Sequence, residues 1–321
     1  MKKTALLVGK IAVSLGLLGY LFSTTDMGAL LDRVRRGDLV LLVAAVVLYL
    51  LMLGVATWRW RLLLLAQGFA ARLGPLSASY LVASFFNNFL PSNIGGDVVR
   101  VRDSAQITGS TTTSLAIVAI DRILGLGALY VLALLAFAFA DPQEREFAGA
   151  RSILLLLGLV FATLAYVFFR PGVARRLMHA TRLSALPWAR ERFHVVQAAV
   201  HVYRARMRDV WVAFGASVAL QALAVLYFHS VARALAIPLD LSASFLMVPL
   251  CTLIQTVPVS FNGWGVRESV FILYFHQVGL PRESALAFSL VGAGLIVLLS
   301  LSGAIVWMAR GETPGANGGP R

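Results

Sequence analysis

Six long apolar runs constrain the fold of this chain more than any other feature of its sequence. Each run is long enough to cross a hydrocarbon core of about 30 Å as an α-helix. The runs cover residues 6–22, 39–57, 115–140, 153–169, 210–232 and 285–309. A bilayer excludes open sheets and lipid-exposed irregular segments. We therefore expect an all-α polytopic membrane protein with about six full spans, the first of them an uncleaved helix.

The positive charge of the chain is concentrated between two of these runs. Of a net charge of +13, residues 170–209 carry nine arginines against two acidic residues. Loops rich in Lys and Arg stay in the cytoplasm, so we expect a bacterial inner-membrane protein with both termini cytoplasmic and no nucleic-acid partner. Within this loop, residues 190–208 have apolar side chains at helical spacing, which predicts an amphipathic helix on the cytoplasmic leaflet.

Two further segments, residues 77–100 and 241–268, begin as apolar runs and are then interrupted by Pro, Gly and charged residues. The charge pattern places both ends of the first segment in the cytoplasm and both ends of the second outside. We therefore expect two re-entrant hairpins of broken helices, which enter the membrane from opposite faces.

The two interruptions share a short motif. PSNIGGDVVR at residues 91–100 and PVSFNGWGVR at residues 258–267 both read P-x4-G-x2-V-R without a gap. A long span precedes each copy and another follows it, which predicts an inverted repeat with halves at about 39–140 and 210–309. In transporters of this architecture, broken helices meet near the midplane and form the substrate site. We expect one domain over residues 1–309 and a disordered tail at 310–321.

The residue types at the interruptions suit an anionic ligand. Proline and glycine break the helix and allow tight turns, and the next half-helix begins with unsatisfied N–H groups that attract an anion. Arg100 and Arg267 can each bind a phosphate through two guanidinium N–H groups, and we expect Asp97 and Glu268 to pair with them. The predicted lipid-binding residues are Asn88, Pro91, Asn93, Gly95, Gly96, Asp97, Arg100, Asp121, Arg122, Gln255, Pro258, Ser260, Asn262, Gly263, Gly265, Arg267 and Glu268.

Two simpler readings of these charges stay open. The charged residues of the motifs could cap short helices at the membrane interface without any ligand. Asp121 and Arg122 could form an ion pair near the cytoplasmic edge of their span, or they could line the cavity.

Three stretches resemble motifs of the lysylphosphatidylglycerol synthase transmembrane-region family. They are FFNNFLPSNIGGDVVR at 85–100, AIDRILGL at 119–126 and VPVSFNGWGVRES at 257–269. The resemblance implies a flippase-like helical domain that moves a lipid, or a lipid-linked group, between leaflets. The chain stops at Arg321, so we expect no soluble synthase domain here. By resemblance, hopanoid and polyprenyl-linked sugar pathways are also possible settings.

The functional hypotheses belong to three classes. The first is a lipid translocator for an anionic or phosphate-bearing lipid. The second is a membrane enzyme of lipid-linked sugar, hopanoid or aminoacyl-lipid synthesis, and the third is an accessory subunit that binds such an enzyme. The sequence has no acidic cluster, HxxxH motif or Walker loop near the interruptions. We therefore expect a non-enzymatic protein without metal or cofactor, whose partner is a membrane lipid.

Overall fold

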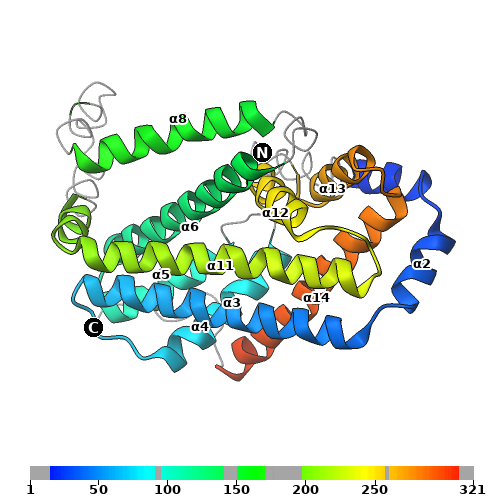
Figure 1. The fold of residues 1–321 in the computed structure, drawn as a ribbon. Helices are drawn as coiled ribbons and strands as arrows, with labels where there is room; N and C mark the ends of the chain where they lie inside the picture. Colours follow the sequence, from blue (N-terminus) through cyan, green and yellow to red (C-terminus); the bar gives the residue numbers. More distant parts are fainter. Residues whose placement is uncertain are drawn as a thin grey trace.

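The computed structural model describes residues 15–90, 95–140, 150–170, 176, 197–256 and 260–310, and all regular secondary structure in these ranges is helical (Figure 1). Four helices are long and apolar enough to cross a membrane, and they confirm four of the six predicted spans. These are α3 (Leu39–Ala66), α6 (Thr111–Phe139), α11 (Met207–Ala234) and α14 (Arg282–Ala309). The others with defined bounds are α2 (Met27–Arg35), α4 (Leu73–Phe89), α5 (Gly95–Thr108), α8 (Ala150–Phe169), α12 (Leu241–Gln255) and α13 (Val266–Gln277).

The structure describes one of the two remaining predicted spans and only part of the other. Helix α8 occupies the position of the span predicted at 153–169. The span predicted at 6–22 lies largely outside the described residues, and its described part is helical from residue 15. The predicted tail at 310–321 and most of the basic loop at 170–209 also lie outside the described residues.

Helices α3 and α11 lie side by side and run in opposite directions across the molecule (Figure 1). At one end, the backbone N–H of Asp38 donates to the carbonyl oxygen of Ala234 at 2.8 Å. At the other end, the hydroxyl of Tyr203 donates to the carbonyl oxygen of Leu63 at 3.0 Å. These contacts define a Tyr203 end and an Ala234 end of the molecule, which we use below.

Both interrupted segments fold back on themselves. In the first, the Asn87 side chain of α4 accepts a hydrogen bond from the N–H of Gly96 in α5 at 2.8 Å. Farther from the break, the hydroxyl of Ser79 donates to Asp103. In the second, the thiol of Cys251 in α12 lies 3.9 Å from the carbonyl oxygen of Arg267 in α13. Each segment is therefore a helical hairpin.

The two hairpins start from opposite ends of the molecule. Helix α4 follows the C-terminus of α3 at the Tyr203 end, and α12 follows the C-terminus of α11 at the Ala234 end. Helix α4 packs on α14, and α12 packs on α6. The first of these interfaces is close, since a side chain at Gly303 of α14 would overlap the backbone carbonyl of Leu81. Each hairpin thus packs against the last long helix of the other half of the chain.

The Tyr203 end differs from two sequence-based expectations. Residues 58–72 carry Arg59, Arg61 and Arg72 and no acidic residue, which predicts a cytoplasmic loop. Instead, α3 continues to Ala66 and buries Arg59 and Trp60. In the predicted amphipathic helix, residues 197–205 are helical, but Tyr203 does not face a leaflet. It is fully buried against α3, and this burial raises the pKa of its phenol, so the hydroxyl stays protonated as a donor.

Candidate functional site

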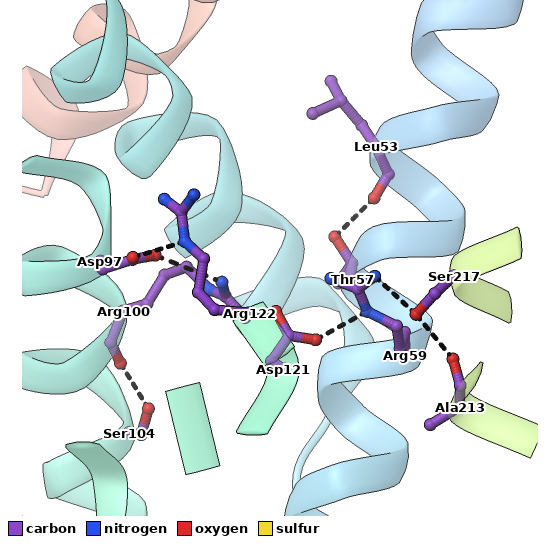
Figure 2. A network of polar contacts seen from close by, with 10 residues as sticks. All are labelled: Leu53, Thr57, Arg59, Asp97, Arg100, Ser104, Asp121, Arg122, Ala213 and Ser217. Carbon is purple, nitrogen blue, oxygen red and sulfur yellow. Dashed lines mark hydrogen bonds and ion pairs between the residues drawn. The ribbon is translucent and has the colours of Figure 1, made fainter. Parts of the chain in front are cut away.

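A buried carboxylate joins two arginines from different helices near the start of α5 (Figure 2). Arg100 of α5 donates through Nη2 to Oδ2 of Asp121 in α6 at 2.8 Å. Arg59 of α3 donates through Nε to the other oxygen, Oδ1, at 2.7 Å, and through Nη1 to Oγ of Ser217 in α11 at 2.8 Å. Asp121 is only 1% exposed. The carboxylate therefore links three helices, and Ser217 adds a fourth.

A second carboxylate extends this network towards the surface. Asp97, in the first turn of α5, accepts a bond from Nε of Arg122 at 2.6 Å and lies 3.5 Å from Nη1 of Arg100. The position in the first turn is favourable, because the helix dipole stabilises a negative charge there. We call Arg59, Asp97, Arg100, Asp121 and Arg122 the charge network. It holds three arginines and two aspartates.

Two aromatic rings enclose the guanidinium of Arg100. Its Cζ atom lies 4.7 Å from the ring centroid of Trp60 and 5.0 Å from that of Tyr80. Such cation–π contacts stabilise a desolvated cation. Among the described residues, no acceptor reaches the buried Nε of Arg100 or the buried Nε1 of Trp60. A buried donor without an acceptor is costly, so this place can accept an oxygen atom of a ligand.

The arginine of the second motif has a simpler environment. Arg267 donates to Oε1 of its neighbour Glu268 through Nε at 3.0 Å and Nη2 at 2.5 Å. Its Nε also donates to Oγ of Ser289 in α14 at 2.9 Å, and its Cζ lies 4.6 Å from the ring of Trp264. The other oxygen of Glu268 accepts from the N–H of Gly265 at 2.7 Å. The expected pairing of the motif arginines with Asp97 and Glu268 is thus confirmed, and each guanidinium lies over a tryptophan.

The two interruptions meet in space. The side-chain amide of Asn262 donates to the carbonyl oxygen of Asn88 at 3.5 Å, a long contact between the two hairpins. The turn before α13 has three residues with positive φ, namely 51° at Asn262, 80° at Gly263 and 84° at Gly265. Glycine adopts such angles without steric cost. The expected role of the glycines in tight turns is confirmed there.

Gly96 serves packing. A Cβ atom at this position would overlap the carbonyl oxygen of Ala83 and the Asn87 side chain, so only glycine lets α5 approach α4 this closely. Gly95 beside it is also buried. This close approach positions the first turn of α5, and with it Asp97 and Arg100, against α3 and α6.

Apart from Gly95 and Gly96, which lie in the first turn of α5, the predicted site residues fall into three groups. Pro91, Asn93 and Pro258 lie outside the described residues. Asp97, Arg100, Asp121 and Arg122 come together in the charge network. The second hairpin holds Gln255, Ser260, Asn262, Gly263, Gly265, Arg267 and Glu268, and Asn262 connects them to Asn88.

The sequence left two interpretations of Asp121 and Arg122 open, an ion pair near the cytoplasmic edge or a part of the cavity lining. Asp121 is buried and bonded to α3 and α5. The Arg122 side chain is 43% exposed and reaches Asp97 on α5. Both neighbours therefore bind α5, Asp121 inside the protein and Arg122 towards its surface, and these two described residues do not pair with each other.

Several residues of this region were not among the predicted site residues. Arg59 and Trp60 fall in the segment 58–72 that the charge pattern predicts as a cytoplasmic loop, although WRWR directly follows an apolar run, which is a signal for a buried charge. Tyr80, Ser217 and Ser289 have no local sequence signal, because their partner arginines are on other helices. Trp264 lies three residues before its partner Arg267, so this contact was within reach of a spacing argument. In the described ranges, no three His, Cys, Asp or Glu side chains gather closely enough to hold a metal ion.

Long apolar helices, two broken hairpins and a buried charge network together define an α-helical polytopic membrane protein. The chain belongs to the family described as the lysylphosphatidylglycerol synthase TM region, whose family model matches residues 7–303. This match covers all the helices of the charge network and both hairpins. A search of curated proteins returned no match to this chain.

Proposed function

We propose that this protein moves an anionic, phosphate-bearing lipid between the two leaflets of a bacterial cytoplasmic membrane, with both of its termini in the cytoplasm. One observation carries the proposal. Two buried N–H donors, Nε of Arg100 and Nε1 of Trp60, have no acceptor among the described residues. A phosphodiester supplies oxygen acceptors for such donors and a negative charge for the guanidinium.

The arrangement of the hairpins supports transport across the membrane. The hairpins start from opposite ends of the molecule, and their interruptions meet at Asn88 and Asn262. We interpret α3–α6 and α11–α14 as the two halves of an inverted repeat, with both hairpins re-entrant in the membrane. In such repeats, alternating access moves one half against the other around a site near the midplane.

The surface of the hairpins suits the lipid part of the substrate. On α5, Asp97 and Arg100 are buried, whereas Val98 is 65% exposed. Phe89, at the end of α4, is 47% exposed. A headgroup can thus be bound inside while its acyl or prenyl chains stay in the membrane beside the hairpin. Because Trp60 of α3 and Tyr80 of α4 enclose Arg100, we expect headgroup entry to require a movement of these two side chains away from the guanidinium.

The direct test is lipid exchange in liposomes that contain the purified protein. The probe is phosphatidylglycerol with a fluorescent headgroup, and a membrane-impermeant quencher reports how much of it reaches the outer leaflet. We expect faster exchange than in empty liposomes, and a loss of at least about tenfold in Arg100→Ala and Arg267→Ala, because each loses a charge-assisted bond. Arg35→Ala, at an exposed arginine of α2, is the matched control and should exchange lipid like the wild type.

The predicted topology has a separate test. Single cysteines are introduced at exposed positions in a Cys251→Ala background, and their reaction with an impermeant thiol reagent is measured in oriented vesicles. Gly74 and Gln106 flank the first hairpin, and Asp240 and Val278 flank the second. We expect both members of the first pair to react from the cytoplasmic side and both members of the second pair from outside. Opposite sides within either pair would exclude a re-entrant hairpin.

The family description supports a second candidate function, because it names the transmembrane region of a synthase. The chain would then be an accessory subunit, or a membrane enzyme, of aminoacyl-lipid, hopanoid or lipid-linked sugar synthesis. Folded protein that does not accelerate exchange of phosphatidylglycerol, aminoacyl-phosphatidylglycerol or polyprenyl phosphate would favour this candidate over the translocator.

A further inference from the structure

A basic hollow lies at the Tyr203 end, apart from the charge network. It has a volume of about 380 Å³ and is lined by His201, Arg204, Ala205 and Met207. The first three belong to the helical residues 197–205, and Met207 is the first residue of α11. The hollow therefore occupies the corner at which the chain turns from the basic loop into a long apolar helix.

The helix that carries the hollow is fixed to the protein by its opposite face. The buried Tyr203 hydroxyl donates to the carbonyl oxygen of Leu63 at 3.0 Å. The side-chain amide of Gln67 donates to the carbonyl oxygen of the buried Ala199 at 2.9 Å. At 100° per residue, His201 lies on the face opposite Tyr203, and Arg204 lies on the flank between the two faces. His201 is exposed and Arg204 is half-buried, on a helix whose inner face is anchored on α3.

The lining combines two kinds of chemistry. His201 and Arg204 are three residues apart, so they lie on neighbouring turns of one helix face and can bind the same anion. Ala205 and Met207 add an apolar wall beside them. A free phosphate needs only the basic part of such a site. A phospholipid headgroup with its glycerol backbone uses both parts.

The surroundings favour a lipid of the membrane surface. Arg206 and Arg208 are exposed on either side of Met207, and Trp211, one turn farther along α11, is 63% exposed. Tryptophan is enriched at the membrane interface, and basic residues near it attract anionic lipids. Along the chain, the hollow is followed by the arginines and then by the exposed tryptophan. This is the order expected for a headgroup site, the charged membrane surface and the membrane interface.

We propose that this hollow binds one anionic phospholipid as a resident lipid, with His201 and Arg204 on its phosphate and Ala205 and Met207 against its glycerol region. This lipid is distinct from any transported lipid, since Tyr203 and Leu63 lie in the buried cluster between the hollow and Trp60. The proposal does not depend on lipid transport, and it specifies what the basic loop binds at the membrane surface.

The test is lipid binding by the purified full chain in a neutral detergent, measured by native mass spectrometry. The probe is dioleoyl phosphatidylglycerol, with dioleoyl phosphatidylcholine and inorganic phosphate as comparison ligands. We expect a phosphatidylglycerol adduct whose apparent Kd rises about tenfold or more in Arg204→Gln, because a charge-assisted bond is lost. Arg206→Gln removes the same charge from the neighbouring turn and should change the Kd less than about threefold, as a screened surface charge does.

A second variant tests the hollow without a change of charge. Ala205→Trp fills the space and should weaken phosphatidylglycerol binding as much as Arg204→Gln does. Unchanged thermal unfolding without lipid confirms that each variant is folded. Equal losses in Arg204→Gln and Arg206→Gln would show diffuse surface attraction and overturn the proposal. So would an unchanged Kd in Ala205→Trp, or competition by inorganic phosphate at millimolar concentration.

Discussion

Asp121→Asn is the change that most directly tests the charge network. Asp121 supplies one oxygen to Arg59 and the other to Arg100, and its side chain is 1% exposed. Asparagine has nearly the same size, but it is neutral and one of its two terminal atoms becomes a donor. The variant therefore places an N–H group against an arginine and leaves two buried guanidinium groups with less neutralising charge.

The expected cost follows from this burial. Removing one partner of a buried ion pair typically costs about 3–5 kcal/mol, because the other charge stays buried without compensation. Asp121 has two such partners, although Ser217 and Asp97 still contact them. We therefore expect the free energy of unfolding to fall by about 3–5 kcal/mol. Asp32→Asn is the matched control, since Asp32 and Arg36 are mostly exposed at 3.8 Å, and such pairs contribute at most about 1 kcal/mol.

The assay is unfolding of the purified protein in mixed micelles by increasing amounts of a denaturing detergent, followed by tryptophan fluorescence. A double variant, Arg59→Met with Asp121→Asn, separates charge from packing. It removes one of the uncompensated guanidinium groups, so it should be more stable than Asp121→Asn alone. The non-additive free energy of this cycle should reach about 1 kcal/mol or more.

Two results would refute the reasoning. If Asp121→Asn lost no more stability than Asp32→Asn, the carboxylate would not neutralise buried arginines. If the costs of Arg59→Met and Asp121→Asn simply added, the two residues would act independently, in conflict with their 2.7 Å contact.

Three further changes have defined outcomes. Gly303→Val should lower the free energy of unfolding by about 1–3 kcal/mol, because its side chain would overlap the α4 backbone; Gly294→Val, with open space at its Cβ, is the control, and equal costs would contradict the close packing. Arg267→Lys should slow lipid exchange about as much as Arg267→Ala, since lysine lacks the planar fork; exchange at the wild-type rate would show that charge alone suffices. Tyr203→Phe should cost about 0.5–1.5 kcal/mol in chemical unfolding. Burial raises the pKa of this phenol, so the contribution of Tyr203 to the free energy of unfolding is full below about pH 10 and falls above it. A stability difference between the wild type and Tyr203→Phe that grows above pH 10 would contradict a contribution from the buried, protonated hydroxyl.

Much of the fold could be predicted because hydropathy is a local signal. The apolar runs at 39–57, 115–140, 210–232 and 285–309 lie within α3, α6, α11 and α14 or extend one residue beyond their ends. Where α3 ends could not be predicted, since WRWR has the composition of a cytoplasmic loop. The charge of Arg59 is neutralised by Asp121, which lies 62 residues away in the chain. The two residues are too far apart in the chain for their pairing to be recognised from local sequence.

The difference between local and long-range signals also explains which parts of the candidate site could be predicted. Glu268 is adjacent to Arg267, and Asp97 lies one helical turn before Arg100, so both pairs could be predicted from spacing. Ser217 and Ser289 could not, because a serine in an apolar helix is common and its partner arginine is on another helix. The Trp60 ring over Arg100 likewise depends on how α5 packs against α3, which only the assembled fold determines.

The two motif arginines differ in a way that bears on mechanics. The carboxylate of Glu268 is on the same helix as Arg267, so a shift of α13 from α14 would keep this ion pair and break the two hydrogen bonds with Ser289. Arg100 is joined to Asp121 on a different helix, so a shift of α5 from α6 would separate buried opposite charges. Such a separation costs more than the loss of the hydrogen bonds to Ser289. If the proposed transport involves opening and closing, we therefore expect α12–α13 to move while α4–α5 stays in place on α6.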